Sequence, residues 1–263
     1  METIEVLKSY VEEIKNSAID LIKRRGMSSI GEKTEALKKQ IEERGYVVIP
    51  GFLSEKECEE IRNTIEEVIK TNKRIWIDSE GSDHRIFFSN LASPMIEGCF
   101  RNNFIIEVLS AYEKTPAYNG FTLANKVVYK ENNAGSGGGW HRDFVKRKQT
   151  KALLYLSPVS EKNGPFQFLE GSHKFGSIVN YQKEFDFKFN QNRFSDQEID
   201  TVVQKYPHLL NTITGETGSL ILVDTRGIHR GKPIEDGTRY ALTNYYWFNG
   251  SIPGHIRKLN PFA

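Results

Sequence analysis

Cysteine is almost absent from this chain, which has only Cys58 and Cys99 among 263 residues. Because they do not form a C-x-x-C pair, neither a disulfide framework nor a cysteine-based zinc site is expected. No apolar run is long enough to cross a bilayer, and Glu2 and Glu5 argue against a signal peptide. A net charge of +2 is too small to favour nucleic acid or an anionic membrane as a partner. These absences predict a soluble, cytoplasmic protein.

The residues that are present have an ordinary globular composition with a moderate excess of aromatics. Charged residues make up 27% and hydrophobic residues 38% of the chain, which is typical of a soluble domain. The 16 Phe and 11 Tyr favour a β-rich core or a ligand pocket. The length suits one large domain or two small ones.

The N-terminal region has the pattern of helices. Apolar residues recur every three or four positions over residues 2–25, which predicts an amphipathic helix. A second helix is expected from Glu32 to Arg44, with Gly45 as its C-terminal stop. We expect residues 1–44 to form a helical extension that packs on the core, and an oligomer formed through these helices is an open alternative.

We expect residues 45–263 to form the main domain. A short strand over 46–53 precedes a helix that opens with a capping box at Ser54–Glu57, and residues 95–113 are expected to be helical. Several further strands separated by turns indicate a β sandwich or barrel. They are expected at 121–129, 151–156, 166–169, 218–224 and 239–248. Residues 174–212 interrupt them with an insertion of a size that often covers a site.

A glycine run, Gly137–Gly139, leads into His141 and Asp143. In an extended backbone, residues two apart point to the same side, so these two side chains can bind one ion together. By itself an H-x-D pair is weak evidence, because a polar pair on a flexible loop is about as common. Further ligands must come from elsewhere in the chain.

A facial-triad iron site needs two histidines and one carboxylate, and it leaves open positions for substrate and oxygen. The six histidines are His84, His141, His173, His208, His229 and His255. His173 follows a strand within a G-S-H-K segment, where a role in stabilising the loop is more natural. His229 differs from the others because it comes shortly after a hydrophobic strand.

Arg239 lies ten positions after His229 and begins the next strand. A dicarboxylate cosubstrate that chelates a metal with one end needs a fixed cation for its far carboxylate. The planar guanidinium of arginine binds a carboxylate bidentately. The ordered set from H-x-D through N-G-P and G-S-H-K to His229 and Arg239 is hard to obtain by chance, so we favour a metal site.

This ordered set resembles the phytanoyl-CoA dioxygenase-like branch of the iron(II)/2-oxoglutarate-dependent oxygenases over roughly residues 45–250. The matching segments are Gly45–Pro50, Trp140–Asp143, Asn163–Phe166, Gly171–Lys174, Gly218–Leu220 and the pair His229 and Arg239. The resemblance implies a mainly β fold with helices, in which N-terminal and packing helices flank a double-stranded β-helix, or jelly-roll, core.

The same resemblance implies the roles of four residues. His141, Asp143 and His229 would bind iron(II), and Arg239 would bind the C5 carboxylate of 2-oxoglutarate. With O2 as the oxidant, such enzymes convert 2-oxoglutarate to succinate and CO2 while they oxidise a second substrate.

Two further cations are candidates for contacts with the cosubstrate or the substrate. Lys126 shares a strand face with Ala124 and Val128, so it would be a buried cation in need of an anion if that face lines the barrel. A solvated lysine is an equally good interpretation. Arg85, just before Ile86, has the same two alternatives, as a contact to the substrate or as a residue outside the site.

Two residues of the H-x-D segment are candidate substrate contacts. Trp140 could form a wall of the pocket, or it could be a core aromatic, which is the commoner fate of such a residue. Arg142 should point away from His141 and Asp143, which predicts a salt bridge or a place at the pocket rim.

The function predicted from these features is hydroxylation of an aliphatic C–H bond in a small-molecule metabolite. Desaturation or cyclisation, and the same chemistry on a protein side chain or a carrier-tethered acyl group, are open alternatives. A jelly-roll module that only binds 2-oxoglutarate and a metal is the non-enzymatic alternative.

Overall fold

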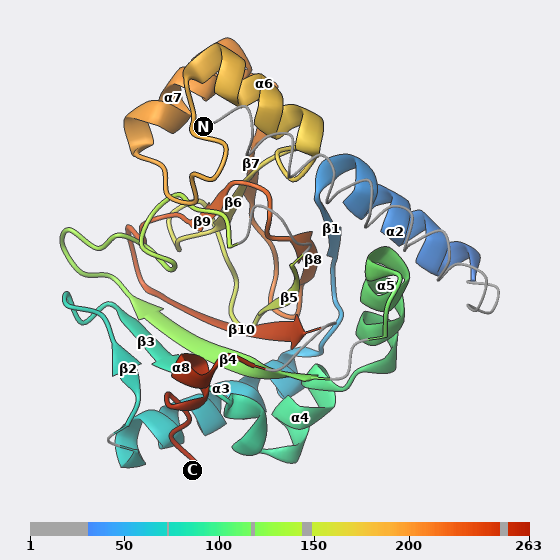
Figure 1. The fold of residues 1–263 in the computed structure, drawn as a ribbon. Coiled ribbons are helices and arrows are strands. Elements are labelled where there is room, and N and C mark those ends of the chain that lie inside the picture. Colours follow the sequence, from blue (N-terminus) through green and yellow to red (C-terminus); the bar gives the residue numbers. More distant parts are fainter. Residues whose placement is uncertain (1–30, 73, 117–118, 144–148, 248–251) are drawn as a thin grey trace.

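The computed structural model describes residues 31–263 except 73, 117–118, 144–148 and 248–251 (Figure 1). The predicted helix over 2–25 lies outside the described residues. The main element is a seven-stranded antiparallel sheet in the order β1-β8-β5-β10-β4-β3-β2. Its strands are β1 (Tyr46–Ile49), β2 (Trp76–Ile77), β3 (Asp83–Ile86), β4 (Asn119–Val128), β5 (Thr150–Tyr155), β8 (Leu220–Asp224) and β10 (Thr238–Trp247).

A second antiparallel sheet has three strands in the order β7-β6-β9. They are β6 (Phe166–Leu169), β7 (Leu210–Ile213) and β9 (His229–Gly231). Residues of both sheets line one cavity, so the site lies between the sheets. The two antiparallel sheets and their helices confirm the predicted mainly β class.

The helices divide into two groups (Figure 1). The first group covers the outer face of the large sheet and consists of α2 (Glu32–Arg44), α3 (Glu55–Thr71), the 3-10 turn η2 (Ser89–Leu91), α4 (Pro94–Phe100) and α5 (Asn103–Glu113). The remaining elements are α6 (Phe175–Phe185), α7 (Asp196–Lys205), the 3-10 turn η3 (Pro207–Leu209) and the C-terminal α8 (Gly254–Arg257). No helix in the described part of the chain is both long and apolar enough to span a bilayer.

Strand β10 shows how the sequence separates the core from the cavity. Its odd-numbered residues from Arg239 to Tyr245 line the cavity, whereas Leu242 and Tyr246 belong to the hydrophobic core on the other face. This division follows from the two-residue alternation of side chains along a strand.

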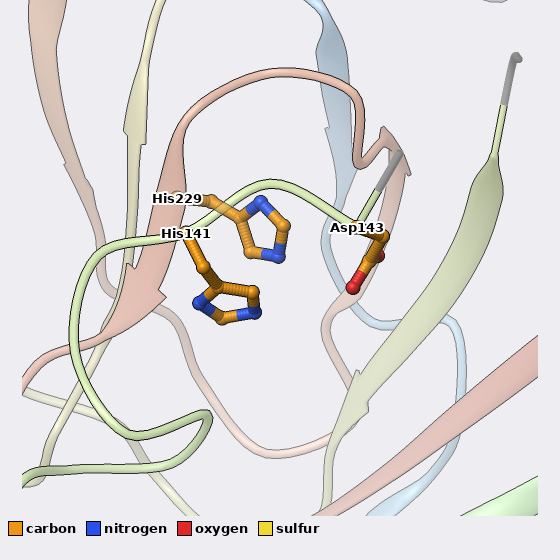
Figure 2. Close-up of side chains that lie close together, drawn as sticks. All are labelled: His141, Asp143 and His229. Atoms are coloured by element: carbon orange, nitrogen blue, oxygen red, sulfur yellow. The ribbon is translucent and has the colours of Figure 1, made fainter. Parts of the chain in front are cut away.

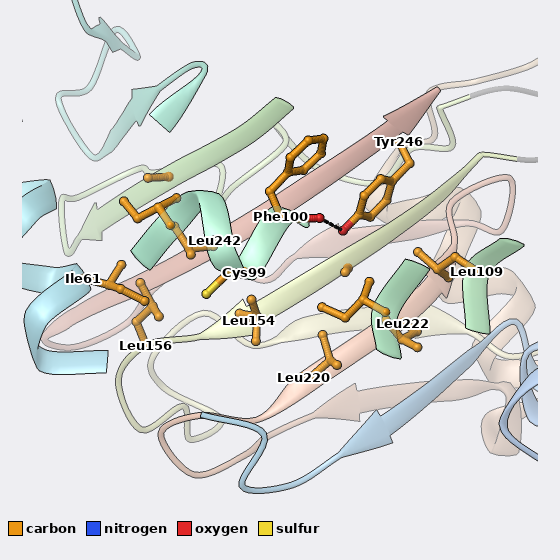
Figure 3. Close-up of a cluster of buried hydrophobic side chains, with 14 of the residues drawn as sticks. Ile61, Cys99, Phe100, Leu109, Leu154, Leu156, Leu220, Leu222, Leu242 and Tyr246 are labelled. Carbon is orange, nitrogen blue, oxygen red and sulfur yellow. Dashed lines mark hydrogen bonds between the residues drawn. The ribbon is translucent and has the colours of Figure 1, made fainter. Parts of the chain in front are cut away.

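The core fills the space between the large sheet and the first group of helices (Figure 3). Ile61 of α3 and Leu109 of α5 pack with Leu154 and Leu242 of the sheet, and all four are fully buried. Each such side chain stabilises the fold by about 1.5–3 kcal/mol relative to an exposed one. The core therefore holds the sheet rigidly behind the cavity.

The predicted helix over 95–113 is in fact two helices. Helix α4 ends at Phe100, and α5 starts after Asn102, whose side-chain oxygen accepts hydrogen bonds from the backbone N–H groups of Phe104 and Ile105. Asparagine is a strong N-cap because its side chain satisfies free backbone donors at a helix start. The apolar periodicity continues across the break between α4 and α5, which explains why the sequence predicted a single helix.

The insertion at 174–212 contains α6, α7, η3 and β7. Its apolar side chains form a separate cluster with Trp140 and Ile228, which directly precede His141 and His229 in the sequence. The insertion therefore supports both segments that carry the predicted histidine ligands.

Replacement of Leu242 by alanine tests the role of the core. We expect Leu242→Ala to lower the free energy of unfolding by about 2–5 kcal/mol, because the buried side chain leaves a cavity. Urea denaturation measures this change. Leu91→Ala is the matched control, because Leu91 is 57% exposed, and its effect should stay within about 0.5 kcal/mol. Equal effects of the two variants would contradict this description of the core.

Candidate metal centre

The structure brings together three side chains that can bind one metal ion (Figure 2). One ligand atom from each of His141, Asp143 and His229 lies within 4.8 Å of the others. His141 and Asp143 belong to the segment that precedes β5, and His229 begins β9 of the small sheet. Two imidazoles and one carboxylate form the donor set of a facial triad, which suits iron(II) and leaves coordination positions open.

Backbone hydrogen bonds position these three residues. The N–H of His141 donates to the carbonyl of His229 over 2.9 Å, and the N–H of His229 donates to the carbonyl of His141 over 2.8 Å. This reciprocal pair places the imidazole ring centroids 4.3 Å apart. The N–H of Asp143 donates to the carbonyl of Thr225 over 3.0 Å, so the carboxylate is held to the loop before β9.

The two imidazoles have their tautomers set in the same way. Nδ1 of His141 lies 2.9 Å from the carbonyl oxygen of Gly139, and Nδ1 of His229 lies 2.8 Å from that of Gly227. Because a carbonyl oxygen only accepts hydrogen bonds, Nδ1 carries the proton in each neutral ring. Nε2 is then free to bind the metal, as in many metal-binding histidines.

The electrostatics of the three groups favour metal binding. Burial lowers the pKa of His141 to about 4 and that of His229 to about 3, so both rings are neutral near pH 7. Burial alone would raise the pKa of Asp143, but Lys151 and the two histidines hold this pKa well below its usual value. The Lys151 Nζ lies 2.6 Å from Oδ2 of Asp143. The site therefore presents neutral imidazoles and an ionised carboxylate.

Gly137 permits the position of the His141 ring. A Cβ on Gly137 would lie 2.5 Å from Cε1 of His141, and the residue has a φ of +93°, which favours glycine. The carbonyls of Gly137 and Gly138 both accept hydrogen bonds from the guanidinium of Arg193 in the insertion. The glycine run therefore leaves room for the His141 ring, and Arg193 anchors the run to the insertion.

The three ligands border a cavity of about 230 Å³. Arg239, which the sequence predicted for the cosubstrate, lines this cavity and is buried. One of its terminal nitrogens donates to the carbonyl of Gly164, whereas its Nε has no hydrogen-bond partner among the described residues. A buried guanidinium without a carboxylate partner fits an anionic group such as the far carboxylate of 2-oxoglutarate.

Of the two further candidate cations, only Arg85 lines the cavity. Lys126 lies in β4 between Asn125, which lines the cavity, and Val127, and its side chain leaves the opposite face of the sheet. There its Nζ forms a 2.6 Å ion pair with Glu66 of α3. This placement contradicts the predicted contact of Lys126 with the cosubstrate, because its charge is already paired outside the cavity.

Trp140 and Arg142 do not line the cavity. Trp140 is 3% exposed and packs in the cluster beneath the insertion, as a core aromatic does. Arg142 is also buried, and its guanidinium donates to the backbone carbonyls of Gln191 and Phe189. Neither side chain lines the cavity where a substrate contact was predicted: Trp140 has the core position that was its alternative, and Arg142 ties the insertion to the ligand segment.

Three further residues of the cavity are not among those predicted from the sequence. Lys151, Arg193 and Tyr245 line it, and Lys151 faces Tyr245 across the β5–β10 pair. A charged residue at the start of the apolar segment Lys151–Leu156 was the available signal for Lys151. His173 is buried, and its Nε2 lies 3.1 Å from the carbonyl oxygen of Glu42, which agrees with the predicted structural role.

Gly137→Ala tests whether the glycine run shapes the metal site. We expect it to weaken nickel(II) binding at least about tenfold, because the new methyl group displaces the His141 ring, and disturbed ligand positions cost about that much affinity. Gly139→Ala is the matched control, since Gly139 also has a positive φ of +86° but has open space around its Cβ position. Isothermal calorimetry measures both affinities. Equal losses would show that backbone strain alone matters.

The lowered pKa values of the histidines predict a flat pH dependence of metal binding. Two imidazoles with an ordinary pKa near 6.5 would lose about tenfold in affinity between pH 7 and pH 6, because protons compete with the metal. With both pKa values near 4 or lower, protonation begins only below about pH 5. Nickel(II) titrations at pH 8, 7 and 6 should therefore give the same affinity within about threefold. A tenfold loss at pH 6 would contradict the buried, neutral state of the rings.

Solved structures with the same fold include three proteins with a bound metal ion. The epimerase SnoN in complex with Fe3+, alpha ketoglutarate and nogalamycin RO superposes with a TM-score of 0.65 at 17% identity, covering 86% of this chain and 89% of that chain. HygX from Streptomyces hygroscopicus with nickel, 2-oxoglutarate and hygromycin B has a TM-score of 0.58 at 15% identity, covering 82% and 87%. EctD from S. alaskensis with bound Fe has a TM-score of 0.60 at 17% identity, covering 82% and 76%.

At these identities the likeness shows the fold, and it confirms the jelly-roll core predicted from the sequence. No curated protein sequence matches the chain. Residues 41–239 match the family described as phytanoyl-CoA dioxygenase (PhyH), and this stretch contains all three metal-binding side chains and Arg239. The chain belongs to the phytanoyl-CoA dioxygenase family of iron(II)- and 2-oxoglutarate-dependent oxygenases.

Proposed function

We propose that this chain hydroxylates an aliphatic C–H bond of a small molecule with 2-oxoglutarate and O2 as cosubstrates. The observation that carries the proposal is the convergence of His141, Asp143 and His229 beside a cavity that also contains the buried Arg239, whose Nε has no hydrogen-bond partner among the described residues. The donor set fits iron(II) and the guanidinium fits a dicarboxylate. Bound there, iron(II) would supply the activation of O2 that couples formation of succinate and CO2 to oxidation of the substrate.

The protein residues have distinct tasks in this reaction. The two Nε2 atoms and the Asp143 carboxylate bind and orient the metal, and Lys151 keeps that carboxylate ionised. Arg239 fixes the far end of 2-oxoglutarate, so that the keto acid end points toward the metal.

Apolar side chains of the cavity exclude water and leave room for a substrate beside the metal. Leu123, Leu153, Phe166 and Val223 provide this lining. Exclusion of water protects the oxidation from side reactions. A cavity of about 230 Å³ between two sheets suits a small molecule better than a protein segment.

Anaerobic addition of iron(II) and 2-oxoglutarate should give a weak visible absorption band, and admission of O2 should then form succinate.

The Arg239→Met variant should require at least about tenfold more 2-oxoglutarate for the same band, because the substitution removes a charge-assisted contact. Its affinity for iron should be unchanged. Lys126→Met is the control, and it should leave the 2-oxoglutarate requirement unaltered, since Lys126 pairs with Glu66 outside the cavity. Absence of both the band and succinate in the wild-type protein would overturn the proposed function.

A further inference from the structure

Lys151 lies directly against one of the three side chains of the candidate metal centre. Its Nζ is 2.6 Å from Oδ2 of Asp143, and the lysine side chain is only 8% exposed. Apart from this ion pair, the buried Oδ2 has no hydrogen-bond partner among the described residues. The Asp143 side chain is nevertheless 22% exposed, so its accessible part does not include Oδ2. Lys151 therefore covers one oxygen of the carboxylate and leaves the other oxygen for a metal ion.

The large sheet holds the Lys151 ammonium group in this place. Strand β5 lies between β8 and β10, and Lys151 pairs in register with Val223 and Tyr245. Its Nζ lies 4.3 Å from the centre of the Tyr245 ring, an arrangement in which the ring attracts the cation. That ring in turn stacks on the buried Phe121, with 4.9 Å between the ring centroids. The ammonium group is thus held between an aromatic ring and a carboxylate.

Asp143 is fixed from the opposite side. Its backbone N–H donates to the carbonyl of Thr225 over 3.0 Å, and its carboxylate points toward the two imidazoles (Figure 2). A carboxylate can bind a metal ion with one oxygen or with both. Binding with both would take Oδ2 away from Lys151, and separating a buried ion pair is unfavourable because it leaves a charge without compensation.

From this arrangement we infer that Lys151 is a positioning residue that makes Asp143 a single-oxygen ligand of the metal. Two imidazole nitrogens and one carboxylate oxygen leave about three positions of an octahedral ion open. Chelation by the keto and carboxylate oxygens of 2-oxoglutarate would leave about one of them free. A second oxygen of Asp143 would fill that last position. The inference rests on the proposed function, because it requires the metal at these three ligands.

The number of water molecules on a bound manganese(II) ion tests the inference. Manganese(II) favours octahedral coordination by oxygen ligands, and broadening of its EPR lines in water enriched in the magnetic oxygen isotope counts the waters that it carries. The full-length wild-type protein saturated with manganese(II) should show about three waters, and about one after saturation with 2-oxoglutarate.

Lys151→Met should show about one water fewer in each state, because the freed Oδ2 becomes a further ligand. Lys151→Leu, which also lacks the charge, should give the same result, so the test does not depend on the folding of a single variant. Lys126→Met is the matched control, since Lys126 is likewise a lysine of the large sheet paired with a carboxylate, that of Glu66 on the other face. It should keep the wild-type counts.

The count separates positioning from a purely structural role of Lys151. A structural role would weaken manganese(II) binding in the Lys151 variants without changing the number of waters at saturation. That unchanged number would overturn the inference. So would about two waters on the metal in the wild-type protein, since both oxygens of Asp143 would then bind despite Lys151.

The wild-type protein also shows whether the proposed function itself fails. Failure of manganese(II) to bind, or of 2-oxoglutarate to displace any of its waters, would refute the proposed function. An altered count on a metal that binds and accepts 2-oxoglutarate would refute only the role of Lys151, so the two failures are distinguishable.

Discussion

The reciprocal backbone pairing of His141 with His229 is the interaction on which the functional site depends. It joins the segment before β5 to the first residue of β9 in the small sheet, and each histidine both donates to and accepts from the other. Ligand spacing is consequently set by the backbone and not by flexible side chains. The carbonyls of Gly139 and Gly227 then set both tautomers, so geometry and protonation are settled before any metal arrives. Because the ligands are already in position, less free energy is lost in ordering them when the metal binds.

Burial of charge is the second constraint on the cavity. Desolvation disfavours the charged form of every group, and it leaves the two histidines neutral. Asp143 stays ionised because Lys151 lies against it. Arg239 has no such carboxylate partner in the part of the chain that the structure describes, and a bound dicarboxylate would provide the missing negative charge. Arg239 in the cavity is therefore suited to the anionic cosubstrate of the proposed function.

Two lysines show where interpretation of the sequence fails. Lys126 and Lys151 both lie on strands with apolar neighbours, and alternation correctly says which residues share a face with each. It does not say which face borders the cavity, because both faces of β4 are buried in its central part. The structure directs Lys126 toward Glu66 of α3 and Lys151 toward Asp143. The prediction of a single helix over 95–113 was wrong for a related reason. The apolar period continues through Asn102, so the pattern gave no sign of the N-cap there.

The donor set and much of the secondary structure could be predicted from the residues alone. The H-x-D spacing, the position of His229 shortly after a hydrophobic strand, the arginine ten residues later and the capping box at Ser54–Glu57 are local signals that need no knowledge of distant contacts. The folded chain was needed to show which cations enter the cavity, that Trp140 and Arg142 support the insertion, and that His141 pairs with His229. These features depend on strand pairing between segments far apart in the chain, and alternation within one strand leaves the choice of face open.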